Sequence, residues 1–166
     1  MEYKIGDKVI HTSFGFAEIV ALEEKEIAGK FDRYYVVKTN KMLVWIPVSH
    51  IDKVTLRFPS SKMVFDELFS ILRSKVSAFS ADRMIRKSEI FSRINEGNSE
   101  SICRLVRDMS FYRTTKKFNE YEKSMFDRAI RVLMDEWQFS LNITPAQARI
   151  DLDGMLAESY SASVIP

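Results

Sequence analysis

The stretch Arg57-Phe58-Pro59-Ser60-Ser61 divides the chain into two halves with different hydrophobic periods. Upstream of it, apolar residues recur with a period of about two, which is typical of strands. Downstream of it, they recur with a period of about 3.6 and capping residues return at intervals, which is typical of helices. The sequence therefore predicts an α+β protein with one domain over residues 1–57 and a second over residues 58–166.

Short runs of β-branched and aromatic residues predict the strands of the first domain. We expect strands at 8–11, 16–27 (one bent strand or two, with the bend at Gly15), 34–38 and 42–48, joined by a hairpin connection over 28–32 and a tight turn over 39–41. No helix is available to cover a flat sheet, so these strands indicate a strongly curved sheet, a small Tudor-like or SH3-like β-barrel.

Capping residues divide the second domain into about five helices, which makes it all-α. The predicted helix starts are Ser60 or Ser61, Ser80 or Asp82, Asn98 or Ser99, Asn119 with Glu122 as a capping box, and Thr144-Pro145. The second helix carries the apolar residues Met84, Ile85, Ile90, Phe91 and Ile94, and Gly97 follows its end. We expect Trp137 in the core and residues 159–163 to fray.

Composition excludes several classes of protein. A chain of 166 residues can bury a core without disulfides or metals, and its single cysteine, Cys103, excludes a disulfide framework or a Cys-rich zinc module. No apolar run approaches the ~20 residues that span a bilayer, and the N-terminus lacks the apolar stretch of a signal peptide. We therefore expect a cytoplasmic protein without a membrane segment.

The sequence assembles no catalytic site. It has two histidines, His11 and His50, and no nucleotide-binding, zinc-protease or serine-hydrolase motif. Each histidine is interpreted as a strand-end or turn residue in preference to a ligand. We expect neither an enzyme nor a bound metal or cofactor.

Positive charge is concentrated in the first part of the second domain. Residues 62–131 carry a net charge of +5, whereas residues 132–166 carry −4. The basic residues are Arg83, Arg86, Lys87, Arg93, Arg104, Arg107, Arg113, Lys116 and Lys117. Such a set can contact the phosphates of nucleic acid, and it can equally be a solvated helical face.

Taken in order, motifs in both halves resemble a known family. They are Tyr3-Lys4-Ile5-Gly6-Asp7-Lys8-Val9-Ile10, Gly15, residues 23–29, Tyr34-Tyr35-Val36-Val37 and Val44-Trp45-Ile46-Pro47-Val48, then Gly97, Leu105-Val106-Arg107-Asp108-Met109 and Phe118-Asn119 with Glu122-Lys123. Together they resemble the CarD/CdnL family of bacterial RNA polymerase-binding transcription regulators. The first half is also similar to the polymerase-interaction domain of transcription-repair coupling factors, but this chain has no helicase motif.

The resemblance implies a non-enzymatic regulator with two binding partners. The barrel is expected to bind the β subunit of bacterial RNA polymerase through a strand edge. The helical domain is expected to contact promoter DNA, mainly its backbone and minor groove, at the upstream edge of the transcription bubble and to stabilise the open complex. The resemblance further suggests a nucleoid-associated monomer. An alternative is a general DNA-binding or architectural protein whose barrel binds a partner other than polymerase.

The resemblance also implies the residues that bind polymerase. Lys25 stands where the family has an arginine, and Trp45 stands at a second arginine position. Trp45 is interpreted as an interface anchor or, alternatively, as barrel core. Its neighbours Val44, Ile46 and Pro47 complete the predicted polymerase-binding strand, although alternation makes the face of Val44 and Ile46 the better candidate for the core.

The predicted DNA-binding residues lie in the helical half. Arg83 stands where many relatives have a tryptophan that wedges into the minor groove, so that an arginine replaces an apolar side chain. Alternatively, Arg83 belongs to a solvated face. Arg86 and Lys123 coincide with basic positions of the family, and Lys87 and Arg113 join them in the predicted DNA-binding set.

Overall fold

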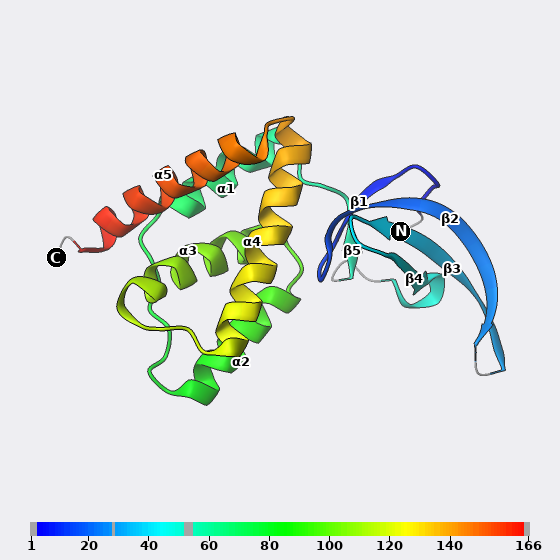
Figure 1. The fold of residues 1–166 in the computed structure, drawn as a ribbon, viewed down its shortest axis with the longest axis horizontal. Coiled ribbons are helices and arrows are strands. Elements are labelled where there is room, and N and C mark those ends of the chain that lie inside the picture. Colours follow the sequence, from blue (N-terminus) through cyan, green and yellow to red (C-terminus); the bar gives the residue numbers. More distant parts are fainter. Residues whose placement is uncertain (1–2, 28, 52–54, 165–166) are drawn as a thin grey trace.

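The computed structural model describes residues 3–27, 29–51 and 55–164, and it shows a curved antiparallel sheet followed by a bundle of helices (Figure 1). The strands are β1 (Lys8–His11), β2 (Gly15–Ile27), β3 (Lys30–Thr39), β4 (Leu43–Pro47) and β5 (Leu56–Arg57), with a 3-10 helix at Val48–His50. The helices are α1 (Lys62–Arg73), α2 (Arg83–Asn95), α3 (Ser99–Thr115), α4 (Glu120–Leu141) and α5 (Pro145–Val164). The α+β class and the order of elements are as predicted.

The sheet has the strand order β4-β3-β2-β1-β5, with every neighbouring pair antiparallel. Its core includes Val9, Ile19, Val37 and Leu56, all of them fully buried. The N-terminal segment also contacts β2, because the Gly6 N–H donates to the Ile19 carbonyl and the Ile19 N–H donates to the Asp7 carbonyl. A small curved sheet can thereby enclose an apolar interior without a covering helix.

The strand predictions need three corrections. The segment 16–27 forms a single strand whose register shifts between Ile19 and Ala21, so the irregularity is a bulge there, and Gly15 is the first residue of the strand, paired with His11. The hairpin that follows is tighter than expected, since β2 reaches Ile27 and β3 begins at Lys30; Ala28 is outside the described residues. The two-residue strand β5, which pairs with β1, was not predicted.

Local capping explains the starts of the helices. Ser61, Asp82 and Asn98 accept hydrogen bonds from main-chain N–H groups of α1, α2 and α3, and Asn119 and Glu122 form the predicted capping box of α4. Gly97 has a φ of 69°, the left-handed conformation expected of a residue after a helix. These contacts lie within three residues along the chain, which is why the sequence predicts them.

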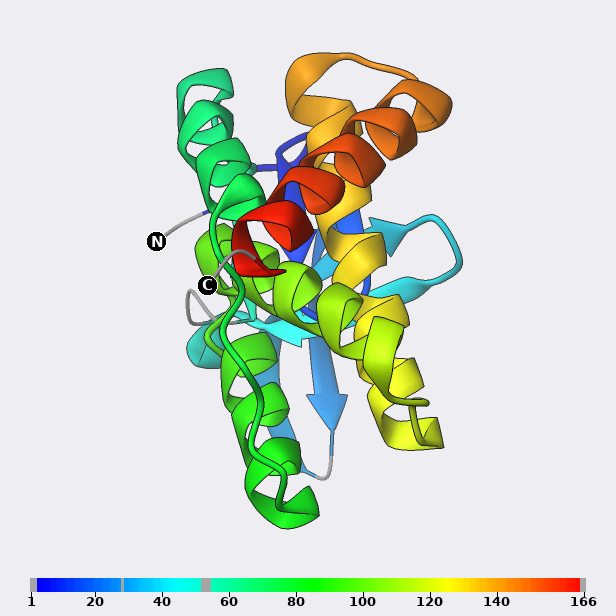
Figure 2. The ribbon, with the colours of Figure 1, turned by 90° about the vertical axis from the view of Figure 1, so that its left-hand side faces the viewer.

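The helical core is built from all five helices, and Trp137 is buried in it as predicted. Figure 2 shows α5 crossing the bundle, where it packs against α1, α3 and α4. The expected fraying of residues 159–163 is wrong. Ser159 is fully buried and donates to the Ser74 carbonyl, and the Ser163 hydroxyl accepts from the Val76 N–H at 3.0 Å.

The two halves are joined by a buried ion pair. The Arg57 guanidinium donates to both carboxylate oxygens of Glu136 at 2.7 Å, and the Ser60 N–H donates to the same carboxylate at 2.8 Å. A second contact lies nearby, where Phe16 and Phe139 pack with ring centroids 4.5 Å apart. The sheet is therefore held against α4 by specific contacts as well as by the connecting segment.

Candidate functional site

Strand β4 forms one edge of the sheet, because β3 is its only neighbour in the strand order of the described residues. An edge strand presents main-chain N–H and C=O groups that no strand on its outer side satisfies. Such an edge can accept an added strand from a partner protein, with side chains supplying the specificity.

Lys25 and Trp45 meet on this part of the sheet. The Lys25 ammonium nitrogen lies 4.0 Å from the centroid of the Trp45 ring, and the indole Nε1 donates to Glu23 at 2.9 Å. Lys25 also forms an ion pair of 3.2 Å with Glu23. Hydrogen bonds from Trp45 and from Lys25 hold the pKa of the Glu23 carboxyl below its ordinary value. Lys25 and Trp45, which are separated along the chain by the whole of β3, thus form one exposed cluster with Glu23.

Trp45 is 39% exposed, so it does not belong to the barrel core. Val44 and Ile46 alternate with it and face the interior: Ile46 is buried and Val44 packs against the sheet core. Their predicted role in binding polymerase is therefore restricted to main-chain groups, because their side chains are occupied by the core. Pro47 lies beside them at the end of β4, where it offers a carbonyl but no N–H.

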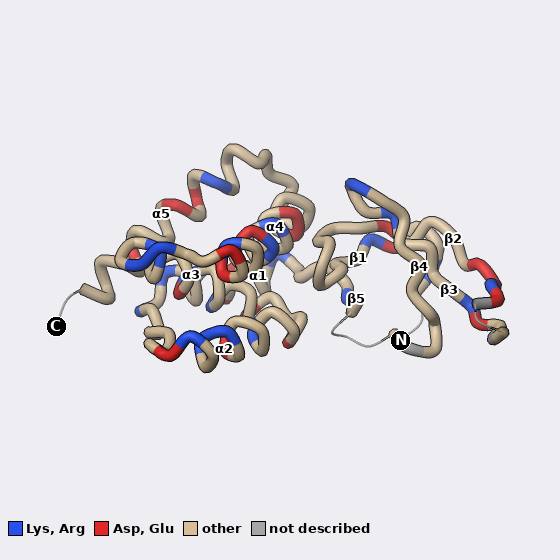
Figure 3. The backbone as a smooth tube through the Cα atoms, turned by 60° about the horizontal axis from the view of Figure 1, so that its bottom comes forward, with Lys and Arg blue, Asp and Glu red and all other residues tan. Residues whose placement is uncertain are grey.

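The structure separates the five predicted DNA-binding residues into two groups. Arg83, Lys87, Arg113 and Lys123 are exposed, whereas Arg86 is buried. Figure 3 shows basic positions along α2 and around the connection between α3 and α4.

The structure corrects the prediction that Arg86 belongs to the DNA-binding set, because this side chain is buried. Its guanidinium donates to Glu122 at 2.8 Å and to the carbonyls of Ser80 and Ala81, and it lies over the ring of Tyr112. The hydrogen bond to Glu122 raises the pKa of Arg86, while burial acts in the opposite direction. Arg86 therefore fastens α2 to the start of α4, and its donors are not directed at a ligand.

The exposed side of α2 also carries apolar residues. Its buried face consists of Arg86, Ile90 and Ile94, whereas Met84 is 70% exposed and Ile85 is 55% exposed. The sequence analysis named Met84 and Ile85 among the apolar residues of this helix without dividing them into buried and exposed ones. Because the main packing partners of α2 among the described elements are α3 and α4, its buried stripe is narrower than the run of apolar residues.

A cavity of about 610 Å³ lies between the end of α3 and the start of α4. We call it the cationic hollow; its principal lining residues are Arg113, Lys116, Lys117, Lys123, Phe118 and Phe126. Asp127 is the only acidic residue among the described residues that line it. Sequence reasoning named Arg113 and Lys123 as DNA-binding residues but did not show that they share a hollow with two aromatic rings.

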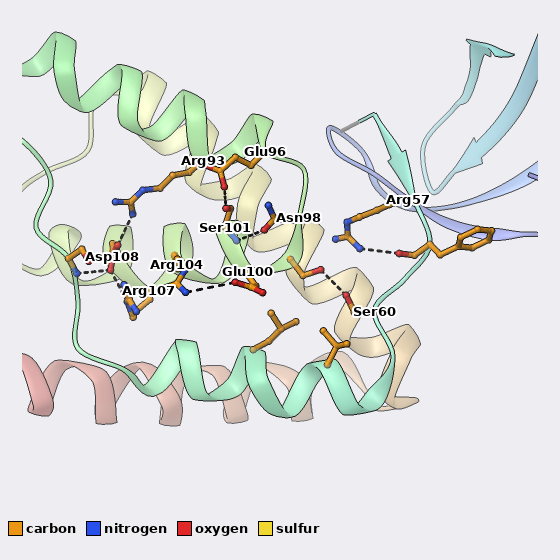
Figure 4. A pocket seen from close by; sticks show the side chains of 15 residues that line it. Arg57, Ser60, Arg93, Glu96, Asn98, Glu100, Ser101, Arg104, Arg107 and Asp108 are labelled. Carbon is orange, nitrogen blue, oxygen red and sulfur yellow. Dashed lines mark hydrogen bonds and ion pairs between the residues drawn. The ribbon is translucent and has the colours of Figure 1, made fainter. Parts of the chain in front are cut away.

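A second cavity, of about 640 Å³, opens where the segment after β5 meets α1, α2 and α3 (Figure 4). Its arginines are paired with carboxylates: Arg93 and Arg107 both contact Asp108, at 2.6 and 2.7 Å, and Arg104 lies 3.9 Å from Glu100. The buried Arg107 also donates to the Ile71 carbonyl. Arg93 and Arg107 therefore stabilise the helical domain and do not form part of a free basic face.

The remaining candidates for chemistry have structural roles. His11 is buried at the end of β1 and accepts a hydrogen bond from the Ser13 N–H at 3.0 Å; burial and the nearby Arg128 lower its pKa. Burial raises the pKa of the Cys103 thiol, which keeps it protonated. Within the described residues, no group of His, Cys, Asp or Glu could hold a metal ion. No helix in that same part of the chain is long and apolar enough to cross a bilayer.

Comparisons with known proteins match both halves. Residues 3–58 match the family model described as CarD-like/TRCF RID domain, and residues 67–153 match the model described as CarD, C-terminal domain. The chain is also 27% identical over 153 residues to the "Putative transcription factor YdeB" of Bacillus subtilis (strain 168), a match that covers 89% of this chain and 97% of the relative.

Proposed function

The chain belongs to the CarD family, whose members are transcription regulators that interact with RNA polymerase, and from this premise we propose how it acts. Its sheet binds the polymerase β subunit through the edge strand β4 and the cluster of Lys25 and Trp45. Its helical domain holds promoter DNA through exposed cations of α2 and of the cationic hollow. Both contacts made together stabilise the open complex.

The observation that carries the proposal is the placement of two unlike surfaces on two domains. The Lys25–Trp45 cluster lies on the sheet, and the exposed cations lie on α2 and on the α3–α4 connection (Figures 1 and 3). The Arg57–Glu136 pair joins the domains, so that polymerase bound at one end positions the other end on DNA. A regulator that bridges two partners requires this arrangement.

The polymerase contact rests on two complementary features. The edge of β4 offers main-chain hydrogen bonds, and Trp45 offers a partly exposed aromatic anchor of the kind enriched at interface hot spots. Lys25 retains a positive charge beside this anchor but lacks the bidentate geometry of an arginine. The β subunit is expected to meet this cluster with acidic or polar groups.

The DNA contact is mainly electrostatic. Four of the predicted DNA-binding cations are exposed and form no ion pair with any described residue: Arg83, Lys87, Arg113 and Lys123. Phosphate contacts of this kind position a protein on DNA without reading its sequence. Promoter selectivity would then come from polymerase.

Capture of purified polymerase β subunit in the absence of DNA tests the proposal. The full chain should retain the β subunit, and both Trp45→Ala and Lys25→Glu should lower the retained amount at least several-fold. Lys62→Glu is the matched control, because it makes the same charge reversal at the exposed start of α1. No capture by the unmodified chain, together with binding to DNA, would favour an architectural protein with a different partner.

A further inference from the structure

The cationic hollow contains both unpaired cations and aromatic rings, whereas contact with the phosphates of a duplex would use only the cations. Four cations, Arg113, Lys116, Lys117 and Lys123, face one carboxylate, Asp127, so that its lining carries a net charge of +3. Within the described residues, no ion pair neutralises any of the four cations. A group of unpaired cations around a concave surface attracts an anionic ligand.

The hollow also has an ordered aromatic wall. The ring of Phe118 is nearly parallel to that of Tyr112, with an interplanar angle of 13° and a centroid distance of 6.2 Å, and it meets the ring of Phe126 edge-on at 5.4 Å. The guanidinium of Arg113 lies 5.1 Å from the centroid of Phe126. Phe118 remains partly exposed, so a flat apolar group can reach its ring.

Cations beside an aromatic ring match the two parts of a nucleotide. The phosphate suits the lysines, and the base suits Phe118, since stacking on an aromatic side chain is available to every base. In an intact duplex the faces of the bases are stacked on one another, so that a protein reaches the phosphates, the sugars and the base edges in the grooves but not a base face. The aromatic wall is therefore useful only to a nucleotide whose base has left the stack.

We propose that the cationic hollow binds an unpaired nucleotide of a DNA strand, an inference that rests on the proposed function and assigns a ligand to part of its DNA surface. The hollow is open to solvent, and its volume of about 610 Å³ is large enough to receive one nucleotide from the side. Lys116 and Lys117 bind the phosphate from the connection after α3, and Phe118 stacks on the base. The helical domain thereby favours DNA that is locally open over DNA that is fully paired.

Fluorescence anisotropy with the full chain tests this preference. The probes are a blunt duplex and the same duplex extended by a short unpaired tail, at one salt concentration. The tailed duplex should bind about five-fold or more tightly than the blunt one. Phe118→Leu should abolish the difference while retaining affinity for the blunt duplex, and Phe118→Tyr should preserve the difference because it keeps a ring for stacking.

Charge variants separate the phosphate contact from general attraction. Lys117→Gln should weaken binding of the tailed duplex more than that of the blunt duplex. Lys62→Gln, which removes the same charge from the start of α1 outside the hollow, should leave the ratio of the two affinities unchanged. As a readout that needs no variant, 2-aminopurine at the first unpaired position should gain fluorescence on binding, because its base leaves the neighbouring bases that quench it and lies against Phe118.

Four results overturn the inference: equal affinity for the two probes, a preference that survives Phe118→Leu, unchanged 2-aminopurine fluorescence, or displacement of the tailed duplex by free deoxynucleoside monophosphate at an equal concentration. The last result would identify a free nucleotide as the occupant. Salt-sensitive binding without any preference overturns only this site and leaves the proposed function standing. Absence of all DNA binding overturns both.

Discussion

Single residues decide which cations of the helical domain are available to a ligand. Arg86 and Lys87 are neighbours on α2, yet Arg86 bonds to Glu122 at 2.8 Å and is buried, whereas Lys87 is exposed. Removing one partner of a buried ion pair leaves the other without compensation. The two adjacent positions should therefore respond differently to the same substitution.

Arg86→Ala is expected to lower the free energy of unfolding by about 3 kcal/mol, because Glu122 would remain buried without its partner. Lys87→Ala is the control and should change it by less than about 0.5 kcal/mol, as exposed substitutions do. Urea denaturation followed by circular dichroism measures both. Equal and small effects would contradict the structural role assigned to Arg86.

Arg83 is the position at which the resemblance to the family implies a departure from a tryptophan, and it is exposed at the first residue of α2. Arg83→Trp should lengthen the lifetime of the open complex, because an apolar side chain can support a partly unstacked base step. Arg83→Ala should shorten the lifetime modestly, since one cation of several is lost. Decay of promoter complexes after addition of a competitor measures the lifetime.

The outcome at Arg83 can be separated from a general loss of charge. Lys87→Ala removes a neighbouring cation and should also shorten the lifetime. If neither substitution at Arg83 changes the lifetime while Lys87→Ala does, Arg83 belongs to a solvated face, and only backbone contact by the other cations remains.

At the scale of elements, α4 approaches the first residue of β2, Gly15, where the chain leaves the turn after β1. The φ of Gly15 is +77°, and a Cβ there would lie 2.7 Å from Oδ2 of Asp135. Burial raises the pKa of Asp135, while a hydrogen bond from the Phe16 backbone acts in the opposite direction. The turn between β1 and β2 thus needs a glycine both for its own conformation and for contact with α4.

Gly15→Ala should lower the free energy of unfolding by about 2 to 3 kcal/mol, because it combines left-handed strain with displacement of Asp135. Gly29→Ala is a matched control, since Gly29 has a φ of +75° and nothing within 4 Å of the added Cβ. It should cost only the strain, about 1 to 2 kcal/mol. If the two variants lose the same free energy of unfolding in thermal or urea denaturation, the Asp135 side chain moves aside without lowering stability.

At the scale of the whole molecule, one buried carboxylate couples the two domains. Burial raises the pKa of Glu136, but the hydrogen bonds and charge of Arg57, together with hydrogen bonds from Ser60, outweigh it and hold the pKa below its ordinary value. A depressed pKa means that this contribution to stability is present above about pH 4.5 and is lost as the pH falls through the folded-state pKa.

Glu136→Gln should therefore lower stability near neutral pH by about 3 kcal/mol. It should also make the loss of stability below about pH 4.5 less steep, because the variant has no carboxylate to protonate at this position. It should leave capture of the β subunit intact, because the Lys25–Trp45 cluster is not altered. The lifetime of the open complex should fall, since polymerase and DNA would no longer be held at a defined spacing. An unchanged lifetime in a variant that is less stable would show that the coupling is only structural.

Binding of the whole protein to duplex DNA should be weak, with a dissociation constant on the order of 10⁻⁴ to 10⁻⁶ M at physiological salt, and should weaken steeply as salt rises. The reason is that its exposed basic groups suit phosphates and do not form a cluster that reads base edges. Titration of labelled duplexes of different sequence over a series of salt concentrations measures this. A tight, sequence-selective and salt-insensitive complex would contradict it.

Local interactions explain what the sequence alone determined. The caps at Asp82 and Asn119 bind main-chain groups two or three residues away, and the alternation along β4 places Ile46 inside and Trp45 outside. Such features depend on the chain within one turn or one strand, where chemical type and spacing suffice. For the same reason the change of period at residues 57–61 predicted the two halves.

Only the tertiary structure decided which distant residues meet. Lys25 reaches Trp45 because β2 and β4 flank β3, and Arg86 is buried because α4 brings Glu122 to it. The end of α5 is ordered because the Ser159 hydroxyl donates to the Ser74 carbonyl, although the sequence of residues 159–163 predicts fraying. Ion pairing, exposure and order at these positions depend on residues that lie far away along the chain. The local sequence does not show which of those residues will become neighbours when the helices and strands pack.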